Sequence, residues 1–577
     1  MSAQILPRAP ARMRLALMAV FAVGLVLAAR LFYWQIVRFD DLSKRATVET
    51  TTDTKIQARR GSIMTRDGQL LAEDSYVYTI KVDPQQVDPS ERSPLASQLA
   101  PILKQSAESI LTQIITDSSS VVLAHDVPAF EGEAALELEQ QPDVIGLDVT
   151  SRRVRVYPGG AFAANVVGFV NTEDNAANGV ESFRDTDLRG VDGSLSGAGD
   201  ALHDMIPFDL PTSQSPVDGA DITLTIDAGM QRVVETELAN AIRDSRSTSG
   251  SIIVMDPQTG AVLALAVWPT ANLNDYYNPV NLPRLNNPTV SAQYEPGSVF
   301  KIVTTAAALD AGTVSPGTYF DDDGSVYVGG QLIKNHDHLA PGHVSLTDVL
   351  RMSLNVEAAK MSVGLGADRF YQYVHGFGFG ALTRIDLADE IAGTVKSVGD
   401  GRWHDADLGT NAFGQGISVT PLQMITAVAA VANQGKLMQP YITQQIRYSN
   451  GNIYNATPTV VRQVIRPETA QTLTRILADA IIGESSNKAI VPGYRIVGKT
   501  GTASIPIPGG YDPVNTIASF AGYLPADDPR FVILVKLDKP QTSEWGSQVA
   551  SPVFASVAKQ LVEMSGLPPD SVRLAGK

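Results

Sequence analysis

A serine and a lysine three residues apart could form a nucleophile and the base that activates it. Ser298 and Lys301 lie in the segment YEPGSVFK, residues 294–301. Its proline and glycine predict a turn, and the apolar run to about Leu309 predicts a helix that carries both side chains on one face. A serine hydroxyl is a poor nucleophile until a base takes its proton. A lysine can be that base only if burial or neighbouring cations lower its pKa. Taken alone, the pair fits a helix N-cap serine and a surface lysine at least as well.

Two further polar segments could complete a site around this serine. The first, Ser353-Leu354-Asn355, follows a predicted helix that begins with the capping-box pattern SLTD at residues 345–348. The second is KTGT, residues 499–502, on a predicted strand over residues 497–503. A strand beside a helix N-terminus lets backbone N–H groups converge on one point, and Gly501 leaves room for a substrate backbone.

Together and in this order, the three segments resemble the S-x-x-K, S-x-N and K-T-G motifs of the penicillin-binding protein superfamily of serine acyltransferases. The resemblance implies that Ser298 is the nucleophile and Lys301 its base. It implies that Ser353 relays protons, that Asn355 contacts the substrate amide and that Lys499 holds a substrate carboxylate.

The same resemblance gives roles to the rest of the K-T-G segment. It assigns substrate binding to Thr500, Gly501 and Thr502. The N–H groups of Ser298 and Thr502 would form an oxyanion hole, and losing one such donor typically costs about 10²–10³ in rate. Leu354 departs from the Ser or Asp that the family often has there, at a position that points away from the reacting atoms.

Other segments resemble class B penicillin-binding proteins, which are membrane-anchored, monofunctional peptidoglycan D,D-transpeptidases. Residues 59–72, RRGSIMTRDGQLLA, are similar to the segment that opens them, with Thr65 where the family usually has aspartate. Similar boxes of the N-terminal pedestal module and of the catalytic domain lie at residues 179–190, 414–423, 545–547 and 552–554. The N-terminal region lacks the Glu-Asp box and following histidine of a glycosyltransferase module, which predicts a monofunctional protein.

An apolar stretch near the N-terminus predicts a membrane anchor. Residues 15–37 read LALMAVFAVGLVLAARLFYWQIV, and as a helix they would extend about 34 Å, enough to cross a bilayer. Arg8, Arg12 and Arg14 precede the stretch, so the positive-inside rule predicts a cytoplasmic tail over residues 1–14 and an extracytoplasmic catalytic domain. The alternative is a signal peptide cleaved after Ala28.

The rest of the chain divides into two expected domains, a pedestal (dimerisation) domain at 38–215 and a transpeptidase domain at 216–577. The boundary lies in the loop-like segment DLPTSQSP, residues 209–216. After it, the patterns predict a strand, a helix, a hairpin at residues 250–268, a helical insertion, three strands and a last helix. This order predicts an α/β (α+β) domain with an antiparallel sheet and helices on both faces, as in the penicillin-binding transpeptidase and serine β-lactamase fold.

Bulk composition narrows the function classes further. A net charge of −16 argues against nucleic-acid binding, and the absence of cysteine excludes disulfides and thiolate metal sites. His336, His338 and His343 could suggest a metal site, with the first two on one strand face. No acidic or thiol ligand set of known spacing accompanies them, so we predict loop histidines, no metal and no cofactor.

The resemblance therefore predicts an enzyme that cross-links peptidoglycan stem peptides through a serine acyl-enzyme and that β-lactams inhibit. Its implied partners are stem peptides, lipid-linked precursor strands and a SEDS-family glycosyltransferase with other division or elongation proteins. We favour the division septum over the lateral wall. The alternatives are a β-lactamase or D,D-carboxypeptidase, which passes the acyl group to water, and a non-catalytic penicillin-binding scaffold or sensor.

Overall fold

The computed structural model describes residues 11–42, 51–198, 212–483 and 488–575. The chain splits into two compact units. Unit 1 comprises Met1–Arg59 and Gly190–Asp218, and unit 2 comprises Arg60–Arg189 and Gly219–Lys577. Every residue of the predicted catalytic motifs belongs to unit 2.

Unit 1 contains the apolar N-terminal helix and a small sheet. Helix α1 (Ala11–Phe32) continues as the π-helix η1 (Tyr33–Val37). Together, the two are long and apolar enough to cross a membrane. Antiparallel strands β1 (Thr51–Ile56), β8 (Gly193–Ala198) and β9 (Thr212–Gln214) form the sheet, in the order β1-β8-β9. The loop predicted over residues 209–216 is therefore wrong at β9, whose backbone pairs with β8. Residues 209–211 lie outside the described residues.

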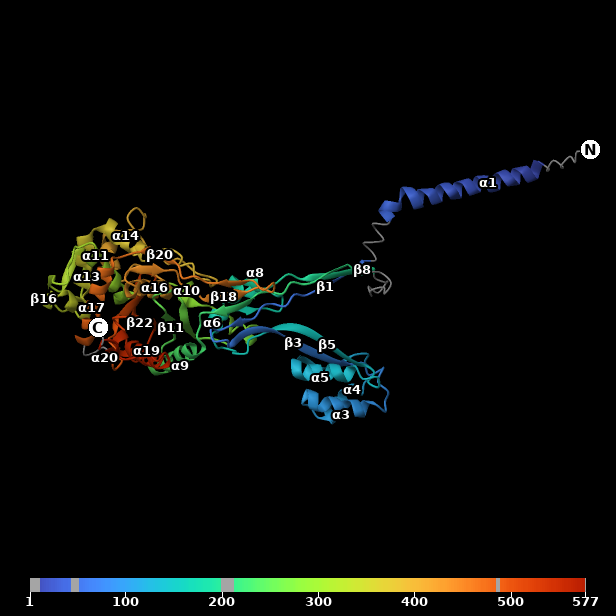
Figure 1. Cartoon of the computed structure of the whole chain (residues 1–577), viewed down its shortest axis with the longest axis horizontal. Helices are drawn as coiled ribbons and strands as arrows, with labels where there is room; N and C mark the ends of the chain where they lie inside the picture. Colours follow the sequence, from blue (N-terminus) through green and yellow to red (C-terminus); the bar gives the residue numbers. More distant parts are fainter. Residues whose placement is uncertain (1–10, 43–50, 199–211, 484–487, 576–577) are drawn as a thin grey trace, which may run out of the picture. The chain divides into compact units, whose positions relative to one another are not determined.

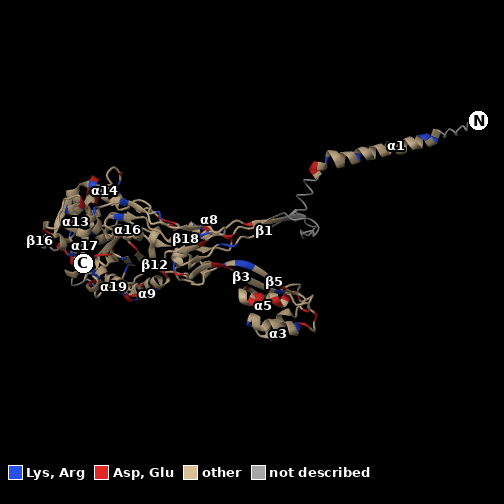
Figure 2. Ribbon diagram, viewed as in Figure 1, with Lys and Arg blue, Asp and Glu red and all other residues tan. Residues whose placement is uncertain are grey.

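The N-terminal part of unit 2 is a small α/β layer with its own core. Its strands are β2 (Ile63–Met64), β3 (Leu70–Val82), β4 (Val121–Pro128) and β5 (Leu147–Val156), and β3 pairs antiparallel with the other three. Helices α3 (Arg92–Leu103), α4 (Ala107–Ile114) and α5 (Ala129–Glu139) cover this sheet (Figure 1). Ile80, Leu99 and Ile110 are fully buried between the layers. Figure 2 shows that α5 is strongly acidic, in keeping with the negative charge of the chain.

Four buried charged residues connect the two pedestal boxes. Arg60 comes from the first box, and Glu181 comes from the second, on helix α7 (Gly179–Phe183). The Glu181 carboxylate lies 2.7 Å from the Arg60 guanidinium and 2.8 Å from that of Arg155, which also lies 3.1 Å from Asp74. Burying a charge is costly unless it is paired, so each of these four side chains depends on its oppositely charged partners.

Strand β10 (Asp221–Leu224) joins the transpeptidase segment to the pedestal strands. It pairs in parallel with β2 and antiparallel with β18 (Thr443–Arg447), whose other neighbour is β19 (Ile453–Asn455). One sheet thus contains strands from both sides of the predicted boundary at residues 215–216.

The main sheet of unit 2 has five antiparallel strands in the order β12-β11-β23-β22-β21. These are β11 (Ser249–Met255), β12 (Val262–Trp268), β21 (Val497–Ile507), β22 (Gly510–Leu524) and β23 (Phe531–Asp538). The predicted hairpin at residues 250–268 is confirmed as β11–β12. The last hairpin, β21–β22, is longer than the alternation of residue types predicted, and its register shifts between Ser504 and Pro506.

Helices cover both faces of this sheet, as predicted. Helices α9 (Ala228–Ser245) and α19 (Ser551–Met564) bury Val234 and Phe554 against one face. Helices α11 (Lys301–Asp310), α16 (Pro421–Ala432) and α17 (Pro467–Gly483) pack on the other. A capping box opens α16, with Thr420 as its N-cap and Gln423 as the partner three residues later.

The segment between α11 and α16 forms a helical lobe. It contains helices α12 (Leu346–Arg351), α13 (Asn355–Leu365), α14 (Ala367–Gly376) and α15 (Asp405–Asn411). Its antiparallel pairs are β13 (Tyr319–Asp322) with β16 (Gly342–Ser345) and β14 (Ser325–Val328) with β15 (Gln331–Lys334). The strand predicted for His336 and His338 is wrong, because β15 ends at Lys334 and the chain then turns, held by the buried side chain of Asn335.

The remaining elements are short. They are α6 (Ala164–Val167), β6 (Phe169–Val170), β7 (Ala176–Ala177), α8 (Asp185–Leu188), η2 (Leu273–Asp275), η3 (Leu282–Leu285), α10 (Pro288–Ser291), η4 (Gly297–Phe300), β17 (Lys436–Met438), β20 (Val460–Gln463), α18 (Gly546–Val549) and α20 (Asp570–Arg573).

Candidate active site

The turn that carries Ser298 lies between strand β21 of the main sheet and the loop that precedes α16. The 3₁₀ turn η4 leads directly into α11, so Ser298 lies at a helix N-terminus as predicted. Gly297 has a φ of +56°, a left-handed conformation that glycine adopts most readily, and its N–H donates to the carbonyl of Gly414 at 3.2 Å. A Cβ on Gly297 would lie only 3.0 Å from the carbonyl oxygen of Thr502. The nucleophile turn and the K-T-G strand therefore touch through their backbones.

Lys301 lies beneath the serine and is fully buried. Its Nζ lies 3.1 Å from Ser298 Oγ, 2.6 Å from the main-chain oxygen of Ser353, 3.2 Å from Ser353 Oγ and 2.8 Å from Asn355 Oδ1. Burial lowers the pKa of the Lys301 amine well below its usual value, and the positive charge of Lys499 acts in the same direction. This environment favours a neutral amine beside the serine hydroxyl.

The S-x-N segment forms the junction between α12 and α13. The predicted capping box at the start of α12 is confirmed, with Ser345 and Asp348 bonding each other's backbone N–H. Ser353 has a φ of +57°, which ends α12 and turns its carbonyl toward Lys301. Leu354 is fully buried in the hydrophobic core, which explains an apolar residue in the middle of this motif.

The K-T-G segment occupies β21, next to the nucleophile turn. Lys499 is 4% exposed, and its Nζ donates to Thr500 Oγ1 at 3.1 Å. Thr502 Oγ1 accepts a hydrogen bond from the Gly546 N–H at 3.2 Å, which ties β21 to the start of α18. Lys499 and Lys301 thus provide two buried amines near the nucleophile turn.

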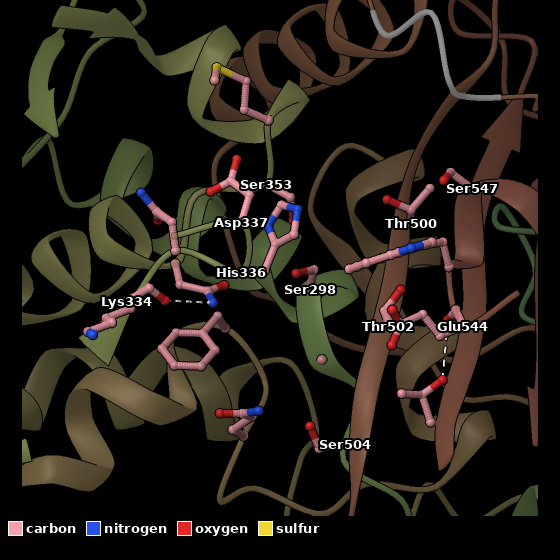
Figure 3. Close-up of a pocket in the computed structure, with 18 of the residues that line it drawn as sticks. Ser298, Lys334, His336, Asp337, Ser353, Thr500, Thr502, Ser504, Glu544 and Ser547 are labelled. Atoms are coloured by element: carbon pink, nitrogen blue, oxygen red, sulfur yellow. Dashed lines mark hydrogen bonds between the residues drawn. The ribbon is translucent and has the colours of Figure 1, made fainter. Parts of the chain in front are cut away.

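These segments border an open cleft of about 840 Å³. Figure 3 shows Ser298 between Ser353 on one wall and Thr500 and Thr502 on the other. The cleft is also lined by residues that include Lys334, Asn335, Asn355, Gln415, Ser504, Thr516 and Gln548. The structure thus brings all three predicted motifs to one place, with Lys301 below the cleft surface.

Two aromatic residues of the cleft were missed as site residues by sequence reasoning. His336 and Trp545 come from opposite walls, and their ring centroids are 5.5 Å apart in an edge-to-face arrangement (T-shaped). Trp545 was noted only as part of a C-terminal box, and no local pattern signals that it meets a residue more than 200 positions earlier. His343 is not among the residues that line the cleft; it pairs with Asp321 and stacks on Tyr319.

Among the described residues, no three or more His, Cys, Asp or Glu side chains are grouped so that they could hold a metal ion.

Comparisons with known proteins match both halves of the chain. A family model for the penicillin binding protein transpeptidase domain matches residues 250–559, and one for the penicillin-binding protein dimerisation domain matches residues 55–224. Stage V sporulation protein D of Bacillus subtilis is 31% identical over 97% of this chain and 86% of its own length. Peptidoglycan D,D-transpeptidase FtsI of Escherichia coli is 28% identical over 96% of this chain and 91% of its own.

Solved structures agree with these matches. Penicillin binding protein 3 of Mycobacterium tuberculosis, complexed with aztreonam, is 27% identical with a TM-score of 0.68, over 89% of this chain and 98% of that chain. Penicillin Binding Protein 2X of Streptococcus thermophilus has a TM-score of 0.76 at 23% identity, over 89% of this chain and 81% of that chain, and shows the fold alone.

Proposed function

Because this chain belongs to the penicillin-binding protein family of transpeptidases, we propose that it cross-links peptidoglycan as a class B D,D-transpeptidase with Ser298 as its nucleophile. The donor would be a stem peptide that ends in D-Ala–D-Ala. The observation that carries the proposal is the buried Lys301 amine, 3.1 Å from Ser298 Oγ. A serine and a base within hydrogen-bond reach, with the base held by further groups, is the arrangement that covalent catalysis requires.

The hydrogen bonds of Lys301 support its role as the base. A neutral amine has two hydrogens, and the shortest contacts of Nζ are to two acceptors, the Ser353 carbonyl and Asn355 Oδ1. With both hydrogens donated there, the lone pair is left for the hydroxyl hydrogen of Ser298. The proton then moves to Nζ as Oγ attacks the carbonyl carbon of the penultimate D-Ala.

The remaining steps follow from the same groups. The tetrahedral oxyanion would be bound by the N–H groups of Ser298 and Thr502, which lie on two segments in backbone contact. The terminal D-Ala leaves as an amine after taking the proton from Lys301, with Ser353 Oγ, 3.2 Å from Nζ, as a relay. An acceptor amine from a neighbouring stem then attacks the acyl carbon and gives a proton to Lys301. The Ser298 ester bond breaks as the cross-linking amide forms, and Lys301 returns the proton to Oγ.

Binding of the donor would use the other wall of the cleft. The substrate carboxylate would pair with Lys499 and accept from the hydroxyls of Thr500 and Thr502, while Asn355 contacts the amide. A β-lactam carries a comparable carboxylate and amide, and it would acylate Ser298 in place of the donor.

We propose that α1 anchors the protein as a single-pass segment with a cytoplasmic N-terminus and an extracytoplasmic catalytic domain. Three arginines before the apolar run support this orientation. Glycan strands would come from a SEDS-family glycosyltransferase, acting with this chain at the division septum. Fluorescence imaging in growing cells checks the placement, because label on the lateral wall would assign the chain to elongation.

The Ser298→Ala variant tests the central proposal. We expect no covalent labelling by fluorescent penicillin and no cross-linked product from a purified stem-peptide substrate, with an unchanged circular dichroism spectrum. Labelling that survives the change would place the nucleophile elsewhere. Wild-type protein that releases D-Ala but forms no cross-link with a supplied acceptor amine would instead be a carboxypeptidase.

A further inference from the structure

A buried carboxylate beside the nucleophile turn has no part in the proposed chemistry. Glu295 lies three residues before Ser298 and is 5% exposed. Its Oε1 accepts from the Gly416 N–H at 3.0 Å, and its Oε2 accepts from the Tyr511 hydroxyl at 3.1 Å. The carboxylate therefore joins three segments that are far apart in the sequence.

Tyr511 belongs to the far end of the β21–β22 hairpin, the hairpin that carries Thr502. Regular pairing of the two strands is interrupted between Ser504 and Pro506, and Tyr511 pairs with Pro506 beyond this irregularity. Such an irregularity bends a strand and weakens the ladder locally. The end of the hairpin consequently depends on contacts outside the sheet for its position, and the hydroxyl of Tyr511 makes one of them.

The charges around this contact keep the tyrosine hydroxyl as the donor. Burial and the neighbouring Glu295 raise the pKa of Tyr511 above its usual value, so the hydroxyl keeps its proton. Burial also raises the pKa of Glu295, against the opposing effects of Gly416, Tyr511 and Lys396. Lys396 is itself paired with Asp407 at 3.0 Å, and among the described residues these two are the further charged groups that act on Glu295 and Tyr511.

We propose that Tyr511 is a positioning residue for acylation, which fastens the hairpin of the K-T-G strand to the nucleophile turn through Glu295. The inference rests on the proposed function. The two oxyanion-hole donors lie on different segments, Ser298 on the turn and Thr502 on β21, and both must point at one oxygen atom. Misplacing reacting groups by about 1 Å can cost about 10²-fold in rate, so a contact that holds these segments in register affects the chemical step.

The Tyr511→Phe variant tests this proposal, because it removes the hydroxyl and keeps the ring. In full-length protein in detergent, stopped-flow mixing with a fluorescent penicillin separates the non-covalent Kd from the acylation rate constant. We expect the rate constant to fall about tenfold or more, with a Kd within about twofold of wild type. The matched control is Tyr448→Phe, which also removes a tyrosine–carboxylate hydrogen bond of 3.1 Å, to Asp187, away from the cleft. This control should acylate at the wild-type rate.

The pH profile gives a readout that general loosening of the structure would not change. In wild type, protonation of Glu295 weakens the contact, so the acid limb of acylation should reflect two groups, Glu295 and Lys301. In Glu295→Gln, which cannot ionise, and in Tyr511→Phe, the limb should reflect Lys301 alone. If Tyr511→Phe acylates like wild type, or Tyr448→Phe is equally slow, or all profiles coincide, the positioning role is wrong. Wild-type protein that never acylates would instead refute the proposed function on which the inference rests.

Discussion

Replacing Lys301 by arginine should separate the charge of this residue from its basicity. Arginine keeps the positive charge but does not lose its proton in a protein. General-base catalysis typically contributes about 10²–10⁴-fold in rate, and the acylation rate of Ser298 should fall by at least this factor. The remaining slow reaction should no longer rise with pH through the Lys301 ionisation.

The size of the effect follows from the burial of Lys301. At its usual pKa of about 10.4, only about one lysine in 2,500 is neutral at pH 7. Burial and Lys499 lower the pKa of Lys301 well below that value. Each tenfold weakening of proton binding by the amine raises this small neutral fraction about tenfold. Wild-type acylation should therefore increase with pH through an apparent pKa well below 10.4, because the neutral amine is the active form.

Acylation rates measured by stopped flow between pH 6 and 10 provide the assay. Lys301→Met controls for the larger volume of arginine in a fully buried site, and it should lose acylation to a similar extent. Lys360→Arg, on the neighbouring helix α13 and paired with Glu357, should acylate normally. A Lys301→Arg protein that acylates near the wild-type rate would refute the reasoning and leave Ser353 or water as the base.

Three further predictions concern the sheet, the pedestal and the anchor. A Cβ on Gly501 would lie 2.4 Å from Ser519 Oγ, so Gly501→Ala should slow acylation about tenfold and lower the stability by about 1–3 kcal/mol. Labelling kinetics and thermal unfolding test this prediction, and wild-type values for both would contradict it. Glu181→Ala leaves the buried guanidinium groups of Arg60 and Arg155 without their shared carboxylate, so it should lower the free energy of unfolding in urea by about 3–5 kcal/mol. A decrease of less than about 1 kcal/mol would contradict the importance of these buried ion pairs. A protein that begins at residue 38 should stay in solution without detergent and acylate at the full-length rate; native circular dichroism without labelling would give the anchor a role in chemistry.

Short-range patterns predicted much of the fold. The capping boxes at Ser345 and Thr420 depend on residues three positions apart, so the sequence alone contains the information that places these helix starts. The hairpin at residues 250–268 likewise follows from alternation and turn residues. The strand predicted for His336 failed because Asn335 bonds to Asp322 and turns the chain, a contact across 13 residues that no local pattern contains.

The sequence predicted which residues form the site but not the distances and contacts between them. The motifs identified Ser298 and Lys301, and the structure places them 3.1 Å apart. Tyr511 was not predicted, because its partner Glu295 is 216 residues away and no local sequence pattern near either residue indicates the contact. The roles of the site residues remain predictions for the acylation experiments.

The backbone carbonyl of Ser353 limits what replacing that residue can reveal. Its distance to Lys301 Nζ is 2.6 Å, shorter than the 3.2 Å from the side-chain oxygen. Substitution with alanine removes the hydroxyl and leaves the carbonyl in place, so a mild Ser353→Ala phenotype would understate how much this position contributes. The left-handed φ of +57° helps to direct that carbonyl, so the backbone conformation at residue 353 contributes to the site as well as the side chain. Glycine or asparagine, which tolerate this conformation, should therefore preserve the orientation of Lys301 better than a β-branched residue such as valine.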